Sequence, residues 1–373
     1  MAPTTTRRKT RHRAAACAAT ATACLAATVW STPASAQTQR AAARAAEATA
    51  EVHWWPVRKN IWMLVGAGTN ITASVGPDGV MLVNSGNAQS TPRVLAAVQD
   101  LQAQLNAFGF LDVLTPARGG AETRSRFPVN THAPPKPIRY IIDTNSLPPS
   151  VGGNEKIAAA GTTYTGGNVA GTIADSSNGA AVLAHENVLN RMQARGMPFE
   201  ALPTETYFTA DYKISTFFND EGVQIIHIPN AVTDGDSFVY FRSADVIAAG
   251  DVLNLDTFPI IDVDSGGSIN GVLAALNTIL KLAIPEFRTE GGTMIVPAHG
   301  RLGDSADVGY YRDMLTIIRD QTKALIDQGL TLQQVLEKRP TFGYEGRFGT
   351  KTGPWTTDMF ITAVYRSLKE HPK

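Results

Sequence analysis

The chain has 373 residues, and its 33 Lys and Arg residues balance 33 Asp and Glu residues. Hydrophobic residues make up 43% of the sequence and charged residues 18%, which is typical of a folded globular protein and not of a disordered chain. The length excludes a disulfide-held miniprotein, and the balanced charge gives no electrostatic reason to bind nucleic acid. A folded protein of enzyme size remains.

The first 36 residues have the pattern of a signal peptide. A basic start is followed by a weakly apolar stretch at 14–30 and by Ala34-Ser35-Ala36, small residues typical of a cleavage site. The apolar stretch is shorter than the ~20 residues that span a bilayer, so we expect no transmembrane segment after the signal is removed. The sequence predicts an exported protein, either periplasmic or secreted.

Removal of residues 1–36 changes the composition. Five of the 33 basic residues lie there, which leaves 28 against 33 acidic ones in the mature chain. Cys17 and Cys24 lie there too, so we expect neither disulfide nor thiolate chemistry. The sequence predicts an Ala-rich leader at residues 37–51 and a single domain at residues 52–373.

Strand patterns dominate the first part of this domain. Short apolar runs separated by Gly-rich turns predict an antiparallel meander, with strands at 61–65, 71–75 and 80–83. Apolar residues at helical spacing predict a helix beginning at Thr91, and residues 137–142 predict a buried strand. Between them, residues 109–136 lack periodicity and predict an insertion loop.

The second part mixes strands and helices. A loop at 145–154 leads to a short helix, and a Gly-rich second insertion is expected at 165–179. Further strands are predicted at 180–184, 214–218, 223–228, 237–241, 246–249 and 294–297. Helices are predicted at 269–283, 304–328, 331–338 and 357–370. No G-x-G-x-x-G follows a strand, which argues against a dinucleotide-binding sheet and favours two stacked sheets covered by helices.

Four stretches resemble, in order and spacing, the metal-site loops of the metallo-β-lactamase superfamily. They are 80–86 (VMLVNSG), 140–154 (YIIDTNSLPPSVGGN), 230–254 (NAVTDGDSFVYFRSADVIAAGDVLN) and 295–300 (IVPAHG). The resemblance covers about 54–339 and extends to the exported hydrolase-like members of that superfamily. It implies an α+β fold, a four-layer αββα sandwich, with the active site at one edge where loops of both sheets meet.

The resemblance also implies a site of two zinc ions held by seven side chains, which share a hydroxide that attacks the substrate. Only two of those seven side chains remain here, Asp251 and His299. The other five positions are occupied by Asn145, Leu147, Pro149, Ser150 and Val232. A further family aspartate, which supports a metal-binding histidine, is replaced by Asn84. We therefore expect a degenerate site with no cofactor.

Two forms of an active hydrolase stay open. Asp251 and His299 would hold a single zinc ion at low occupancy or affinity, because a zinc enzyme normally supplies three ligands. Alternatively, Ser150, His299 and Asp251 would form the metal-free arrangement of a serine hydrolase. Otherwise the chain is expected to be a pseudoenzyme, related to zinc-dependent hydrolases of small esters, lactones or amides, that binds a ligand or partner.

The expected ligand is a small molecule in the former active-site pocket. Leu147 and Val232 replace imidazoles, which favours a more apolar ligand. The two insertions offer a surface for a protein partner. The side chains of Trp54 and Trp55 are expected either to cover the pocket or to pack at the edge of the sheet.

The remaining polar candidates have structural interpretations. His185 is expected to cap the helix that it precedes, and His227 to be a half-buried strand residue. Asp234 and Asp236 are expected to brace the turn that follows Val232.

Overall fold

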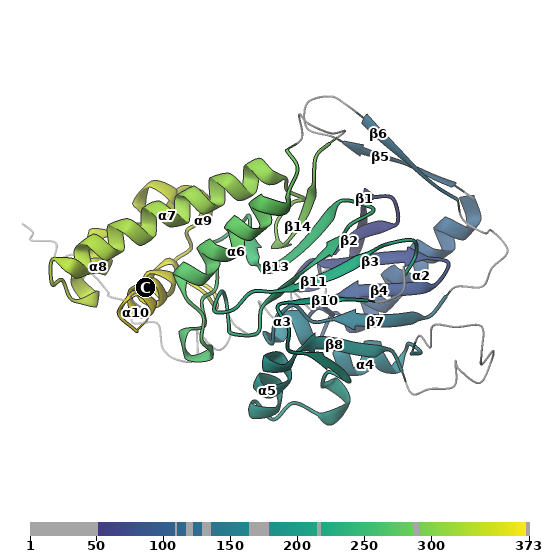
Figure 1. Ribbon diagram of the computed structural model, residues 1–373, viewed down its shortest axis with the longest axis horizontal. Helices are drawn as coiled ribbons and strands as arrows, with labels where there is room; N and C mark the ends of the chain where they lie inside the picture. Colours follow the sequence, from purple (N-terminus) through teal and green to yellow (C-terminus); the bar gives the residue numbers. More distant parts are fainter. Residues whose placement is uncertain are drawn as a thin grey trace, which may run out of the picture. The chain divides into compact units, whose positions relative to one another are not determined.

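The computed structural model describes residues 51–108, 110–116, 122–128, 136–163, 179–214, 218–285 and 291–370. All of them belong to one structural unit, residues 42–373. They form a seven-stranded sheet, a five-stranded sheet and a separate two-stranded hairpin (Figure 1). Among the helices in these ranges, none combines the length and the hydropathy that a bilayer span requires.

The first sheet has the strand order β1-β2-β3-β4-β7-β8-β9. Its strands are β1 (His53–Arg58), β2 (Ile61–Val65), β3 (Ile71–Gly76), β4 (Gly79–Val83), β7 (Ile138–Ile142), β8 (Ala181–His185) and β9 (Glu205–Tyr207). The meander from β2 to β4 is antiparallel, as predicted, and β7, β8 and β9 continue parallel to β4. The carboxyl ends of these parallel strands therefore meet at one edge.

The second sheet follows the chain order from β10 to β14. Its strands are β10 (Asp211–Lys213), β11 (Val223–His227), β12 (Ser237–Phe241), β13 (Val246–Asn254) and β14 (Met294–His299). All neighbours are antiparallel except β13 and β14, which are parallel because α6 crosses between them.

The helices lie between and after the strands. They are α2 (Thr91–Phe108), α3 (Pro148–Val151), α4 (Asn154–Ala159), α5 (Glu186–Ala194), α6 (Ile269–Leu282), α7 (Ser305–Asp327), α8 (Leu332–Lys338), α9 (Glu345–Phe348) and α10 (Thr357–Glu370). Short 3-10 turns occupy Phe199–Ala201, Val263–Ser265 and Phe342–Tyr344.

Alternating side chains build the layers. In β4, Leu82 packs with residues of α2, whereas Met81 faces the core between the two sheets. In β12, Val239 faces that same core, and Phe238 packs with residues of α6, α7 and α10. Figure 1 shows α6 and α7 along the second sheet. Helix, sheet, sheet and helix form four layers, so the predicted αββα sandwich is confirmed.

The prediction of a loop at 109–136 is wrong for two segments. Strands β5 (Phe110–Pro116) and β6 (Glu122–Pro128) pair as an antiparallel hairpin. Backbone hydrogen bonds join the two strands of this ribbon, and they do not depend on an apolar alternation in the sequence. The strand signal that we used was therefore absent here. The rest of this insertion up to residue 135, and residues 165–178 of the second insertion, lie outside the described residues.

Short elements were also missed. β1 contains Pro56 and alternates in exposure, and β9 and β10 have only three residues each, so none shows an apolar run. Of the predicted strand at 214–218, residues 215–217 lie outside the described ranges. The loop predicted at 145–154 contains the helix α3, which begins with two prolines.

Candidate functional site

The predicted site residues come from both sheets. Asn145, Leu147, Pro149 and Ser150 follow β7 in the loop that contains α3, and Val232 lies between β11 and β12. Asp251 lies within β13, and His299 ends β14. β13 and β14 are neighbours in the second sheet, and hydrogen bonds tie the β7 loop to β13.

Asp251 is the centre of a buried polar cluster. Its Oδ2 accepts hydrogen bonds from Nδ2 of Asn145 at 2.6 Å and from Oγ of Ser150 at 2.8 Å. Asp251 is 6% exposed, and both donors are still more deeply buried. Hydrogen bonds to an ionised carboxylate are short and strong. The protein itself therefore directs two positive dipole ends at this oxygen atom.

Local structure fixes the two donors. The side-chain oxygen of Asn145 accepts a hydrogen bond from the backbone N–H of Leu147 at 2.8 Å, which leaves its N–H groups turned to Asp251. Ser150 lies in α3, and its backbone oxygen accepts hydrogen bonds from the N–H and the hydroxyl of Ser85. These contacts hold the two donors in place.

Asn84 connects the end of β4 to the same loop. Its φ of 68° places it in the left-handed region, which asparagine tolerates better than most residues. Its Oδ1 accepts hydrogen bonds from the N–H and the hydroxyl of Thr144, at 3.0 and 2.9 Å. Asn84 therefore orients the backbone immediately before Asn145.

His299, the second of the two retained positions, is half-buried and lies outside the hydrogen-bonded cluster around Asp251. Its backbone oxygen accepts a hydrogen bond from Leu255 at 3.1 Å, but its imidazole makes no hydrogen bond within the described ranges. The hydroxyl of Ser150 donates to Asp251 and not to His299. In a serine hydrolase the imidazole accepts the proton of the serine hydroxyl. The structure brings Ser150 and Asp251 together, and it does not join either to His299 by a hydrogen bond.

The donor set does not fit a dinuclear zinc site. At the five replaced positions, Asn145 and Ser150 turn hydrogen-bond donors towards Asp251, and the other three side chains offer no ligand atom. Among the residues that the structure describes, no group of three or more His, Cys, Asp or Glu is arranged to hold a metal ion. Zinc requires nitrogen, sulfur or oxygen lone pairs directed at it.

Asp236 braces the turn after Val232, as its position predicts. Its Oδ2 accepts a hydrogen bond from the N–H of Thr233 at 2.6 Å. Burial raises the pKa of Asp236 well above its ordinary value, and the negative charge of Asp251 adds to this effect. Asp234 instead pairs with Arg191 at 2.8 Å.

A cavity of about 420 Å³ opens beside the β7 loop. Leu147 belongs to its wall, which therefore includes one of the predicted pocket positions. Much of the remaining wall is apolar and comes from the segment after β13 and from the C-terminal region: Ile260, Ile261, Val263, Trp355 and Met359. The motif positions gave no signal for these residues, although the apolar run at 258–261 marks a buried segment.

A stacked pair of histidines lies at the strand ends beside this edge. His185 ends β8 in the first sheet, and His227 ends β11 in the second. Their rings are parallel within 5°, with centroids 3.7 Å apart. His185 accepts a hydrogen bond from the N–H of Asn187 and caps α5, and His227 is half-buried, so both interpretations are confirmed. The two histidines are 42 residues apart in the sequence, and no pattern in the sequence predicted that their rings would stack.

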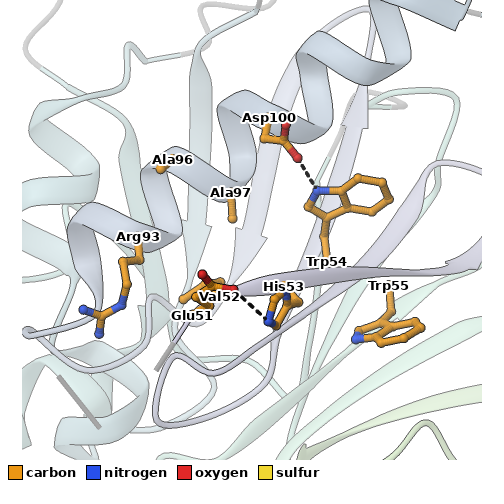
Figure 2. Close-up of a pocket in the computed structure, with 9 residues that line it drawn as sticks. All are labelled: Glu51, Val52, His53, Trp54, Trp55, Arg93, Ala96, Ala97 and Asp100. Atoms are coloured by element: carbon orange, nitrogen blue, oxygen red, sulfur yellow. Dashed lines mark hydrogen bonds and ion pairs between the residues drawn. The ribbon is translucent and has the colours of Figure 1, made fainter. Parts of the chain in front are cut away.

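A second cavity, of about 520 Å³, lies between β1 and α2 and shares no lining residue with the first (Figure 2). The indole N–H of Trp54 donates to Asp100 at 3.0 Å, and its ring packs edge-on against Trp62. Trp55 is 57% exposed. Both tryptophans line this second cavity, so neither covers the cavity beside Leu147.

The fold and the cluster together define an αββα protein whose edge site is built from internal hydrogen bonds. The chain is similar to a metallo-β-lactamase from Pontibacter korlensis, with 12% identity and a TM-score of 0.45 over 71% of this chain and 99% of that one. It is similar to the DIM-1 metallo-β-lactamase, with 11% identity and a TM-score of 0.47 over 71% and 97%. The structure of DIM-1 exposed to ceftazidime is similar too, with 11% identity, a TM-score of 0.46 and the same coverage of both chains. No protein-family model matches the sequence, and no curated protein matches it either.

Proposed function

We propose that this chain is an exported, metal-free member of the metallo-β-lactamase superfamily that binds an apolar small molecule where its relatives hydrolyse theirs. The observation that carries the proposal is the pair of hydrogen bonds from Asn145 and Ser150 to one oxygen of Asp251. Zinc binding through this oxygen atom would require both donors to turn away. That loss, inside a buried cluster, opposes metal uptake.

The cavity beside Leu147 supports the second half of the proposal. Its volume of about 420 Å³ lies within the range of small-molecule sites, and such sites are mostly apolar with a few polar groups. An aliphatic side chain at a position that the family gives to a metal ligand supports an apolar occupant. For a protein partner, we propose the two insertions at 109–136 and 165–179.

Metal content tests the proposal directly. The mature protein, without a His-tag, is incubated with excess zinc, desalted and measured by elemental mass spectrometry. We expect less than about 0.1 equivalent to remain, because two protein ligands hold zinc weakly. Retention of about one equivalent, lost in an Asp251→Asn variant, would contradict a metal-free site.

Turnover is the second test. Ester and lactone substrates should not be hydrolysed above the uncatalysed rate, because Ser150 is fully buried and its hydroxyl donates to Asp251. Chelator-resistant hydrolysis that Ser150→Ala abolishes would instead establish the metal-free hydrolase. Hydrolysis that a chelator abolishes would establish the single-metal one.

A further inference from the structure

We infer that the cavity beside Leu147 takes an amphiphilic cation, a ligand with an apolar body and one positive charge. This inference rests on the proposed function, because it names the ligand class of the same cavity. It depends on three features of the wall: an apolar floor, a carboxylate without a hydrogen bond or ion pair among the described residues, and an indole ring held at one edge.

The floor of the cavity is apolar and buried. Leu147, Ile261, Val263 and Ala363 are each less than 10% exposed. Met359 stands at the mouth and is 43% exposed. Each methylene that a ligand buries on such a surface strengthens binding about fourfold. An alkyl or aryl body is therefore the chemistry that the floor recognises.

The charges of the wall favour a cation. Three carboxylates and one guanidinium line the cavity. The guanidinium, Arg366, is paired with Asp264 through contacts of 2.7 and 3.4 Å and also contacts Glu370. Because its charge is already engaged, Arg366 offers little attraction to an anionic ligand.

The remaining carboxylates differ from each other. Asp262 accepts hydrogen bonds from the backbone N–H of Ser265 and from Arg195. The carboxylate of Asp358, at the start of α10, has no hydrogen bond or ion pair with any residue that the structure describes, whereas its backbone oxygen accepts a hydrogen bond from the hydroxyl of Thr362. Arg339, on whose charge Asp358 acts, pairs with Glu345. The negative charge of Asp358 at the mouth of an apolar cavity is complementary to a cation.

Trp355 supplies a third feature. Its indole N–H donates to the backbone oxygen of Pro259 at 3.1 Å, which fixes the ring in the wall. Among aromatic side chains, tryptophan attracts cations most strongly through its ring face. An alkylammonium group near Asp358 and Trp355, with its chain on the floor, satisfies all three features.

The test compares three probes that share a ten-carbon chain: decyltrimethylammonium, decanol and decanoate. Binding is measured by isothermal titration calorimetry at low salt, below the concentrations at which these probes aggregate. We expect the cation to bind at least about tenfold tighter than the anion, with decanol between them. Shortening the cation by two methylenes to octyltrimethylammonium should weaken binding about sixteenfold.

Three variants locate the charge effect. Asp358→Asn should weaken binding of the cation about fivefold and leave decanol unchanged. Met359→Lys, at an exposed position that tolerates a polar side chain, should reverse the preference towards decanoate. Asp320→Asn is the matched control, because this exposed residue on α7 removes the same charge away from the cavity.

Each result has one meaning. Binding of all three probes with equal affinity would overturn the inference and leave an apolar ligand site, and therefore the proposed function, in place. Failure of all three probes to bind would overturn the inference together with the ligand half of the proposed function, whereas the metal half is decided by zinc retention. A preference for the cation that survives both Asp358→Asn and Met359→Lys would overturn the assignment to this cavity.

Discussion

The hydroxyl of Ser150 donates a hydrogen bond of 2.8 Å to the carboxylate of Asp251, and this bond joins the loop after β7 in the first sheet to β13 in the second. Asn145 donates to the same oxygen atom from the same loop. These hydrogen bonds tie a loop of the first sheet to a strand of the second, so stability should depend on them.

Ser150→Ala should therefore destabilise the protein by about 2 kcal/mol, because hydrogen bonds to a charged group contribute more than neutral ones. The measurement is urea unfolding of the single variants Ser150→Ala and Asp251→Ala and of the double variant. We expect a coupling energy of about 1–2 kcal/mol between the two residues. Ser305→Ala, at a position without a side-chain hydrogen bond to the described residues, should change stability by less than about 0.5 kcal/mol. Additive single effects would contradict a direct contribution of this bond.

A close backbone contact fixes the loop that contains Val232. A Cβ atom on Gly271, in the first turn of α6, would lie 1.7 Å from the backbone oxygen of Asn230. Gly271→Ala should therefore destabilise the protein by about 3 kcal/mol or more, since the backbone of one segment has to move.

The matched control is Gly309→Ala in α7, where a Cβ atom would meet nothing within 4 Å. This change should stabilise the protein by about 0.5–1 kcal/mol, because alanine is the better helix former. Thermal unfolding of the two variants checks the contrast. Equal melting temperatures would show that the contact between Gly271 and Asn230 is not rigid.

Periodicity predicted the layers because alternation has a direct physical cause. Met81 and Leu82 face opposite sides of the first sheet, and an apolar run that is buried on both faces marks such a strand. The family resemblance, not periodicity, led us to expect Asn145 and Asp251 at one edge, and a hydrogen bond joins these two side chains. The sequence did not predict the hairpin β5–β6, whose stability depends on backbone pairing.

Contacts between distant segments were beyond sequence reasoning. Asn145 and Asp251 are 106 residues apart, and only the packing of two sheets decides that the amide reaches the carboxylate. The same holds for Leu147 and Met359, which share a cavity although they are far apart in the sequence. No local pattern encodes a distance across the sandwich.

The buried carboxyl of Asp143 should make the free energy of unfolding depend on pH. Burial raises its pKa to about 8, and the hydrogen bond that it accepts from Asn154 at 2.8 Å only partly opposes this effect. Its Oδ1 and the Oδ1 of Asn154 are both buried and have no partner among the described residues. A proton on the carboxyl of Asp143 removes a buried negative charge that only one side-chain hydrogen bond stabilises.

The folded state therefore keeps a proton that the unfolded state releases above about pH 4. The stabilising effect is fully present below that pH and is lost as pH rises towards 8, by at most about 1.4 kcal/mol per pH unit. Asp143→Asn carries a permanent donor at this position and does not titrate. Relative to the wild type, the variant should gain about 2–4 kcal/mol between pH 5 and pH 8, measured by urea unfolding. A difference that is constant with pH would contradict a protonated Asp143.

The imidazole of His185 should make the free energy of unfolding depend on pH with the opposite sign. Its pKa is lowered to about 4, first by burial and then by the neighbouring charge of His227, and the negative charge of Asp234 partly opposes this. The folded state therefore holds His185 neutral between about pH 4 and 6.5, where the unfolded state takes up a proton. Stability is full above this window and falls as pH drops through it. Asn187 also requires an unprotonated Nδ1 as its acceptor.

His185→Asn separates titration from capping, because asparagine is a strong N-cap residue and does not titrate. The variant should lose the packing of the stacked rings at every pH, but its stability relative to the wild type should rise as pH is lowered from 7 to 5. His53→Asn is the control, since His53 is exposed and, among the described residues, pairs with Glu51 alone, at 3.5 Å. Urea midpoints at pH 5.0, 6.0 and 7.5 decide the matter. If the two variants respond alike to pH, the stacked pair does not stay neutral in the folded protein.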